Sequence, residues 1–313
     1  MSSYGAQRST RQEMLMNEMT QREWGEVADS HFQRVHAFAQ EARVRASRHE
    51  KHPVYDFLTK YYPFSLGKFE KWQPGYGVQL AGGDRQRFSE KWYMYNEDGT
   101  CWVEPSMMRD KERTRLRFIH NLLCLTAKRT PVYSCFGLHE WAMVYTGGDV
   151  RHRESAPLRL SQEEIDEVVR SRALVCTHFD AYRFFSPEAQ PMNKHQPSLE
   201  DRENLEQPAC IHANMDLYKW ASKAMPWVGS DLVWDCFQLA LEARAVDMRA
   251  SPYDLLEWGY EPIRIETEKG RSEYMKSQRR VEAAGHDLRG RLIALLAKVL
   301  QLEHNITSSA QLI

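Results

Sequence analysis

The stretch ACIHANMDLYKWASKAMPWVGSDLVWDCFQLALEARAVDMR, residues 209–249, decides the fold class of this 313-residue chain. Apolar residues recur at helical intervals in both halves of the stretch, and Pro226 and Gly229 separate the halves. Proline and glycine interrupt regular helices. The stretch therefore predicts two strong helices, over 209–225 and 230–249.

Other segments add helices and a few short strands around this pair. Asp98 and Gly99 lie between alternating aromatic residues in KWYMYNEDGTCWVEP (91–105), which predicts a β-hairpin. Short strands are also expected in QPGYGVQLAGG after a turn, in PLRL, in the first half of ALVCTHFDAYRFF and in YEPIRIET. Helical periodicity predicts helices over 22–48, 107–128 and 270–304, a short one starting at Pro53, and one over 161–171 that Ser161 and Glu164 would cap.

These elements predict an α+β protein that is predominantly α-helical, with a few short strands and one β-hairpin. We expect a single large globular domain over 22–304, with flexible segments at 1–21 and 305–313. Residues 187–208 contain four prolines and mostly polar neighbours. They predict a long Pro-rich surface loop, which is the best candidate for an active-site lid or an inserted connection.

Composition limits the classes of function. The formal net charge is −1, which argues against a large nucleic-acid footprint, although not against a local basic patch. No apolar run is long enough to cross a membrane, and the N-terminus lacks the apolar core of a secretory signal. The six cysteines form no CxxC pair and no zinc spacing. We therefore expect a cytoplasmic protein with reduced cysteines and no membrane partner.

Histidines and acids stand together inside apolar segments, where an ionisable group is costly unless it is paired, metal-bound or used in chemistry. His139 and Glu140 are adjacent in LHEWAMVY. His178 and Asp180 would share one side of a strand. His212 and Asp216 are four apart and share a helix face. Further acids follow on the next predicted helix and just after it: Asp231, Asp235, Glu242, Asp247 and, beyond the helix, Asp254.

A metal-free hydrolytic site would suit these residues. One carboxylate could stabilise an oxocarbenium-like transition state while a second group handles protons. If the leaving group is an alkylated purine, the base already carries positive charge, and an aromatic cage would attract it. The candidate catalytic residues are Asp180, Asp216, Asp235, Glu140, His139 and His178, and the candidate substrate-binding residues are Trp141, Tyr145, Tyr182, His212, Tyr218, Trp220 and Arg249.

Two other interpretations remain open. A divalent metal (iron, manganese or zinc) could serve a hydrolase or oxidase of small molecules, with ligands among His139, His178, His212, Asp180 and Asp216. No HExxH motif supports it. A non-catalytic protein could instead hold a planar, nucleobase-like ligand among the aromatic residues. The absence of a P-loop, a convincing GxGxxG and a GxSxG argues against nucleotide-cofactor and serine-hydrolase chemistry.

Seven blocks of the chain carry a resemblance: HPVYDFLTKYYPF, WQPGYG, CFGLHEWAMVY, HFDAYRFF, QPACIHANMDLYKWA, DMRASPYDL and GYEPIRIET. Together they resemble a bacterial protein family commonly labelled 3-methyladenine DNA glycosylase, over about residues 50–282. The resemblance implies an N-glycosylase that hydrolytically releases an alkylated purine during DNA repair, without a cofactor. Its partner would be damaged DNA or a modified nucleoside. The basic helices at 107–128 and 270–304 would then hold the DNA backbone.

Overall fold

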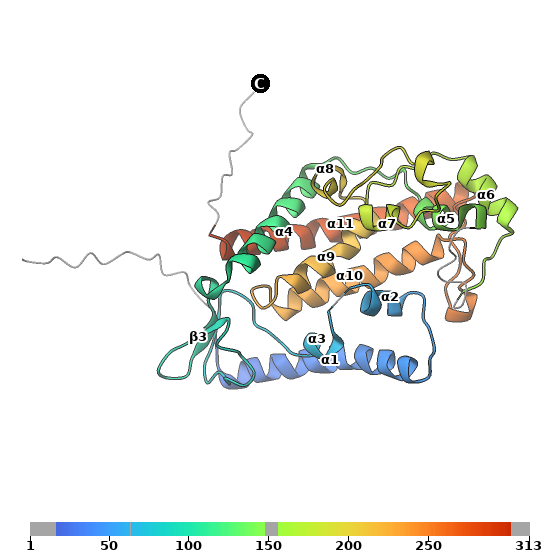
Figure 1. Cartoon of the computed structure of the whole chain (residues 1–313). Helices are drawn as coiled ribbons and strands as arrows, with labels where there is room; N and C mark the ends of the chain where they lie inside the picture. The colour runs from blue at the N-terminus through green and yellow to red at the C-terminus, as the bar shows by residue number, and fades with distance from the viewer. Residues whose placement is uncertain (1–16, 63, 148–155, 302–313) are drawn as a thin grey trace, which may run out of the picture.

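Three long helices form the centre of the computed structural model, which describes residues 17–62, 64–147 and 156–301 (Figure 1). Helix α9 (Ile211–Lys223) packs on α10 (Ser230–Arg249), and both pack on α11 (Glu268–Val299). The predicted pair of helices is confirmed, and the break between them falls at Pro226 and Gly229. The central helices are buried on several faces, because neighbouring elements cover them on both sides.

Two groups of helices cover this centre (Figure 1). On one side, α1 (Gln21–Ser47) lies beyond the short helices α2 (Tyr55–Lys60) and α3 (Leu66–Phe69). On the other side, α4 (Asp110–Lys128) packs on α11 and on α8 (Arg202–Leu205). The same side holds α5 (Leu138–Val144), α6 (Gln162–Arg170) and α7 (Phe179–Tyr182). The 3-10 turns lie at Pro105–Met107, Tyr145–Gly147, Gln190–Met192 and Leu256–Trp258.

The helix ends follow the sequence signals closely. Ser161 accepts a hydrogen bond from the backbone of Glu164, whose side chain bonds back to the Ser161 amide, so the predicted capping box of α6 is confirmed. An equivalent box, which the sequence reading did not identify, joins Thr20 and Glu23 at the start of α1. The short helix α2 begins two residues after Pro53, because the His52 side chain caps its first amides.

A small four-stranded sheet stands at the end of the bundle where α4 begins (Figure 1). Its order is β1 (Asn17–Met19), β2 (Val78–Leu80), β4 (Cys101–Val103) and β3 (Tyr93–Tyr95). The predicted hairpin is confirmed as antiparallel β3 and β4, with Gly99 in a left-handed conformation in the turn. β1 pairs in parallel with β2. Part of the segment expected to be flexible, 1–21, is therefore ordered at 17–19; residues 1–16 and 302–313 lie outside the described residues.

Of the other predicted strands, the one in QPGYGVQLAGG is confirmed as β2, and the remaining three are wrong. PLRL and ALVC each contribute a single bridge, Leu158 to Tyr253 and Leu174 to Asn193, and YEPIRIET forms no strand within the described residues. Side chains replace the missing strand partners. The Asn193 amide donates to the carbonyl of Cys176 and accepts from its N–H, at 2.9 and 2.8 Å. A backbone that is satisfied in this way needs no neighbouring strand.

The Pro-rich segment 187–208, predicted to be a long surface loop, is largely irregular but lies only partly on the surface. Asn193, Arg202, Glu206 and Gln207 are buried within it. The segment includes α8 and carries Arg202 and Glu206 into the interior of the protein.

The predominantly helical α+β class is confirmed. No helix in the described ranges combines the length and the apolar character needed to cross a membrane.

Candidate functional site

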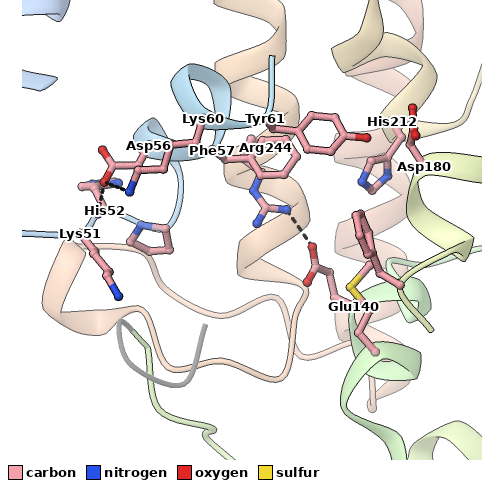
Figure 2. Close-up of a pocket in the computed structure, with 13 residues that line it drawn as sticks. Lys51, His52, Asp56, Phe57, Lys60, Tyr61, Glu140, Asp180, His212 and Arg244 are labelled. Atoms are coloured by element: carbon pink, nitrogen blue, oxygen red, sulfur yellow. Dashed lines mark hydrogen bonds and ion pairs between the residues drawn. The ribbon is translucent and has the colours of Figure 1, made fainter. Parts of the chain in front are cut away.

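A pocket of about 430 Å³ opens between α2, α5, α7 and α10 and reaches α9 at its floor (Figure 2). Such a volume suits a small-molecule site. Three aromatic rings line it, those of Phe57, Tyr61 and Phe184. The other lining residues are Lys51, His52, Pro53, Asp56, Lys60, Glu140, Met143, Asp180, His212 and Arg244.

The pocket has two chemically different ends (Figure 2). Lys51, His52 and Asp56 lie at one end, and His212 and Asp180 lie at the other, with the Tyr61 hydroxyl pointing toward them. Arg244 and Glu140 lie between the two ends. The first end is held by local bonds, since Asp56 accepts from the His52 amide at 3.0 Å and pairs with Lys60 at 3.5 Å.

Charged side chains continue from the pocket floor into the protein, and we call them the buried cluster. One half joins α5 to α10. Nε2 of His139 lies 2.7 Å from Asp247, and Arg244 donates to Asp247 at 2.8 Å and to Glu140 at 2.7 Å. All four residues are buried. His139 and Glu140, adjacent on the short helix α5, therefore meet Asp247 and Arg244 of α10 in one chain of alternating charge.

The other half joins α7, α8 and α9. Asp216 accepts from the Tyr62 hydroxyl at 3.1 Å and from the Lys219 amine. Arg202 bonds Asp180 and lies 3.4 Å from Glu206 and 3.5 Å from Asp216. Lys219 also reaches Asp180 at 3.3 Å. Asp180 is the outermost member, because it lines the pocket and also pairs with the more exposed Arg183 at 3.3 Å.

His212 lies where the two halves meet. Its ring centre is 4.6 Å from that of His139 and 5.5 Å from that of His178. It lines the pocket, and no described residue gives its side chain a hydrogen bond. His139 is held by Asp247 and by Cys135, whose Sγ is 3.4 Å from Nδ1. His212 is therefore the imidazole of the cluster that is available to a bound molecule.

The surroundings of the pocket groups set their protonation. Burial, together with the neighbouring charge of His139, holds the pKa of His212 well below its usual value. Burial also opposes ionisation of Asp180, but Lys219 and Arg202 outweigh it and lower the pKa of that carboxyl. Burial opposes protonation of His139 as well, yet the Asp247 carboxylate outweighs it and raises the His139 pKa. Near neutral pH the pocket thus presents a neutral imidazole beside a carboxylate.

Charge in the cluster is nearly balanced by the protein itself. Four carboxylates are buried, those of Glu140, Glu206, Asp216 and Asp247. Three buried cations face them, Arg202, Lys219 and Arg244. A buried charge is tolerated when it is paired. Asp180, the outermost carboxylate, pairs with the more exposed Arg183, and the proton on His139 supplies a further positive charge, so five carboxylates face five positive charges without any bound ion.

Two groups of residues nevertheless have the arrangement of metal ligands. The ligand atoms of His139, His212 and Asp247 lie within 4.8 Å of one another, as do those of His178, Glu206 and Asp216. In the second group, Nε2 of His178 is 3.5 Å from Glu206 and 3.4 Å from Asp216. Both ring nitrogens of His178 and Oε1 of Glu206 are buried and make no hydrogen bond with the described residues.

The structure brings most of the predicted site residues together. His139, Glu140, His178, His212, Asp180 and Asp216, from three separate segments, all belong to the pocket floor or the buried cluster. Asp235 does not belong there. It lies on the surface and pairs with Arg291 at 2.8 Å. Arg249 pairs with Glu273 at 3.2 Å, also outside the pocket.

The predicted aromatic cage is not the one that lines the pocket. Trp141 is fully buried and donates to the Ala250 carbonyl at 2.8 Å. Tyr218 and Trp220 are core residues, and Tyr145 is almost fully buried. The Tyr182 hydroxyl bonds Gln196. None of these rings lines the pocket; Phe57, Tyr61 and Phe184 line it instead.

The sequence analysis did not predict the buried cations of the cluster, Arg202, Lys219 and Arg244. Arg244 precedes Asp247 by three residues on α10, and Lys219 follows Asp216 by three on α9, a spacing that allows pairing on one helix face. That spacing was a usable signal. Arg202 and Glu206 lie in the segment expected to form a surface loop, where no pattern indicated burial. His52 and Tyr61 likewise gave no signal beyond the aromatic character of their helix.

Comparison of the chain with family models, with curated proteins and with solved structures finds no match in any of the three.

Proposed function

We propose that the protein is a hydrolase that cleaves the N-glycosidic bond of a purine alkylated on a ring nitrogen. One observation carries the proposal. The Asp180 carboxylate, the His212 imidazole and three aromatic rings line the same pocket. A carboxylate and a base beside an aromatic binding surface are the minimum that such a reaction requires.

The aromatic rings account for recognition of the base. Phe57, Tyr61 and Phe184 line the pocket. Arg244 already lies over the Phe57 ring at 4.1 Å and Arg183 over the Phe184 ring at 3.9 Å, so Tyr61 is the ring that we expect to contact the base. Ring faces attract a cation that lies over them, and an alkylated purine in N-glycosidic linkage carries such a charge. The volume of about 430 Å³ is within the range of cavities that enclose small ligands.

Asp180 and His212 account for the chemistry. The bond between C1′ of the sugar and the purine nitrogen breaks, and its electron pair stays on the purine, which leaves as a neutral base. Asp180 stabilises the positive charge that develops on the sugar. A water molecule forms the new bond to C1′, and His212 accepts its proton. Tyr61, whose hydroxyl points toward these two residues, would help to position the water (Figure 2).

The same residues explain why the base should be alkylated. An ordinary purine needs a proton to leave, whereas an alkylated one already carries the charge. The two pocket histidines, His52 and His212, both have lowered pKa values, mainly because they are buried, so neither is a good proton donor at neutral pH. A pocket with this protonation favours the substrate that needs no acid.

The substrate can be a modified nucleoside or a base in damaged DNA, and the cytoplasm stays the proposed compartment. All six cysteines are free thiols, as is usual in a reducing compartment. The test is to incubate the protein with 7-methylguanosine, 3-methyladenine nucleoside and methylated DNA, and to measure free base by mass spectrometry. Release from at least one substrate is expected, and unmethylated guanosine is the control. Absence of release from all three would contradict the proposal.

A metal-dependent hydrolase or oxidase is the second candidate function, and the buried atoms of His178 and Glu206 that make no hydrogen bond with the described residues favour it. Donor atoms around a tetrahedral ion at ~2.1 Å lie roughly 3.4 Å apart. The 3.4 and 3.5 Å separations from His178 have this length, which is long for a hydrogen bond. Against it stand Arg202 and Lys219, which already pair with these carboxylates.

Elemental analysis of the chelator-free protein decides between the two candidates. The metal-free hydrolase predicts less than about 0.1 equivalent of iron, manganese or zinc, and base release that persists in chelator. The metal enzyme predicts about one equivalent, which is lost in His178→Ala and kept in His120→Ala. His120 is the matched control because it lies on α4, outside both ligand groups.

A further inference from the structure

A second cavity differs from the pocket in its charge. It has a volume of about 490 Å³ and lies between α3, α4, α9 and the segment that leads into β3. We call it the basic groove. Six of its lining residues are cations, Lys68, Lys71, Arg87, Arg115, Lys219 and Lys223, and none of its lining residues is an aspartate or glutamate.

Most of these cations have no partner of opposite charge. Lys219 pairs with Asp180 and Asp216. Among the described residues, no carboxylate lies within ion-pair distance of the other five. Arg87 lies over the Trp24 ring at 5.6 Å, and Lys223 lies over the Trp220 ring at 5.4 Å. The ring contacts position these side chains and leave their charge available to a ligand.

Gathering like charges around a concavity costs free energy unless an anion enters it. Lys223 shows the effect, because partial burial and the charge of Lys219 together lower its pKa. The lining residues come from four distant parts of the chain, so the accumulation is a property of the fold. In a chain of net charge −1, such a local excess of positive charge indicates a specific anionic ligand.

Two further features indicate the kind of anion. Phe64 and Trp92 are only partly buried and present rings to the groove. Flat rings beside cations suit a nucleotide, whose base stacks while its phosphates are neutralised. The number of free cations exceeds what one phosphate needs.

We propose that the basic groove binds a nucleotide ligand that carries at least two phosphate groups. A nucleoside triphosphate and a short single strand of nucleic acid share this chemistry, and the experiment separates them. The proposal does not depend on the hydrolase. Its only link to the pocket is Lys219, which contacts the groove as well as Asp180.

The test measures binding of a fluorescein-labelled tetranucleotide by anisotropy at 50 mM salt, with ATP, inorganic tripolyphosphate and adenosine as competitors. We expect the tetranucleotide or ATP to bind, adenosine to compete poorly, and affinity to fall steeply as salt rises. The competitor that binds most tightly identifies the source of the phosphates. A tripolyphosphate that displaces the probe as well as ATP would refute the role of the base.

The variant Lys68→Gln/Lys71→Gln removes two groove cations and should weaken binding at least tenfold. Lys128→Gln/Lys298→Gln is the matched control. It removes the same charge from two exposed lysines outside the groove and should change affinity less than twofold. Equal losses in the two variants, or no binding of any phosphate probe at low salt, would overturn the proposal. The experiment does not measure base release, so a negative binding result would not bear on the proposed hydrolase activity.

Discussion

The buried cluster and the basic groove share Lys219 but differ in whether their positive charges have carboxylate partners. In the cluster, five carboxylates, with Asp180 the outermost, face four cations, with Arg183 the most exposed, and the proton on His139. In the groove, five cations have no carboxylate partner among the described residues. The cluster is complete within the protein, whereas the groove lacks its counter-charge. A charged region that is balanced internally supports structure and positions groups, while an unbalanced one indicates a ligand.

The largest test of this contrast removes a cation from the cluster. Arg244→Met would leave Glu140 and Asp247 buried without their shared partner. We expect a loss of about 3–5 kcal/mol in the free energy of unfolding, measured by urea denaturation. Arg291→Met is the control and should cost less than about 1 kcal/mol, since among the described residues Arg291 pairs only with Asp235, at the surface. Equal effects of the two variants would show that the cluster is not a balanced unit.

A smaller effect is expected from removing one hydrogen bond to the cluster. The Tyr62 hydroxyl is buried and donates to Asp216 at 3.1 Å. Tyr62→Phe should destabilise the protein by roughly 1.5–3 kcal/mol, because the bond goes to a charged group. Tyr133→Phe removes a longer, 3.4 Å bond to Glu282 in a half-exposed position and should cost less than about 0.5 kcal/mol. A Tyr62→Phe protein as stable as the wild type would contradict the claim that Asp216 depends on its neighbours.

Protonation of His52, which lines one end of the pocket, should make the stability of the protein depend on pH. Burial first, and the charge of Arg45 second, lower its pKa to about 4, so the unfolded chain binds the proton more readily. Neutral His52 therefore makes its full contribution to the free energy of unfolding above pH ~6.5, and this contribution is lost as the pH falls toward 4. Protonation of Nδ1 would also break the bonds from the amides of Val54 and Tyr55.

The measurement for His52 is the urea midpoint at pH 7 and pH 5. The wild type should lose more stability between the two values than His52→Asn, whose side chain can cap the helix without titrating. If both proteins lose the same amount, another group controls the acid sensitivity.

The smallest effect belongs to the groove. Lys68→Gln/Lys71→Gln removes charges that have no partner in the structure, so stability should stay within about 0.5 kcal/mol of the wild type or rise slightly. Urea denaturation at low salt measures it. A loss above about 1 kcal/mol would mean that the groove cations serve the fold, which would remove the basis for a ligand there.

Much of the helical fold could be predicted from the sequence, because helix periodicity and caps are local. The breaks at Pro226 and Gly229, the Ser161 cap and the hairpin at Asp98 and Gly99 all show this. The failed strands at PLRL, ALVC and YEPIRIET show the limit. Their apolar pattern is real, but Asn193 satisfies the Cys176 backbone by side-chain bonds that no local rule anticipates.

The site was predictable in part for a related reason. His139, His178, His212 and Asp216 were correctly predicted to belong to the site, because each is an ionisable residue with apolar neighbours in sequence, and such neighbours indicate burial. The residues that pair with them were not predicted. Arg202 and Glu206 reach the cluster from a polar, Pro-rich segment, and Asp235 looked like Asp216 in sequence but faces solvent. Which face of a helix is covered depends on tertiary packing, which a single sequence does not contain.

We propose that Asp180 and His212 hydrolyse an alkylated purine N-glycoside in the pocket. The decisive measurement is the rate of free methylated base formation by the wild type, Asp180→Asn and Asp235→Asn, on methylated nucleosides and methylated DNA. We expect release by the wild type, a loss of at least ~100-fold in Asp180→Asn, and an unchanged rate in Asp235→Asn. Equal rates in all three proteins, or no release by the wild type, would contradict it.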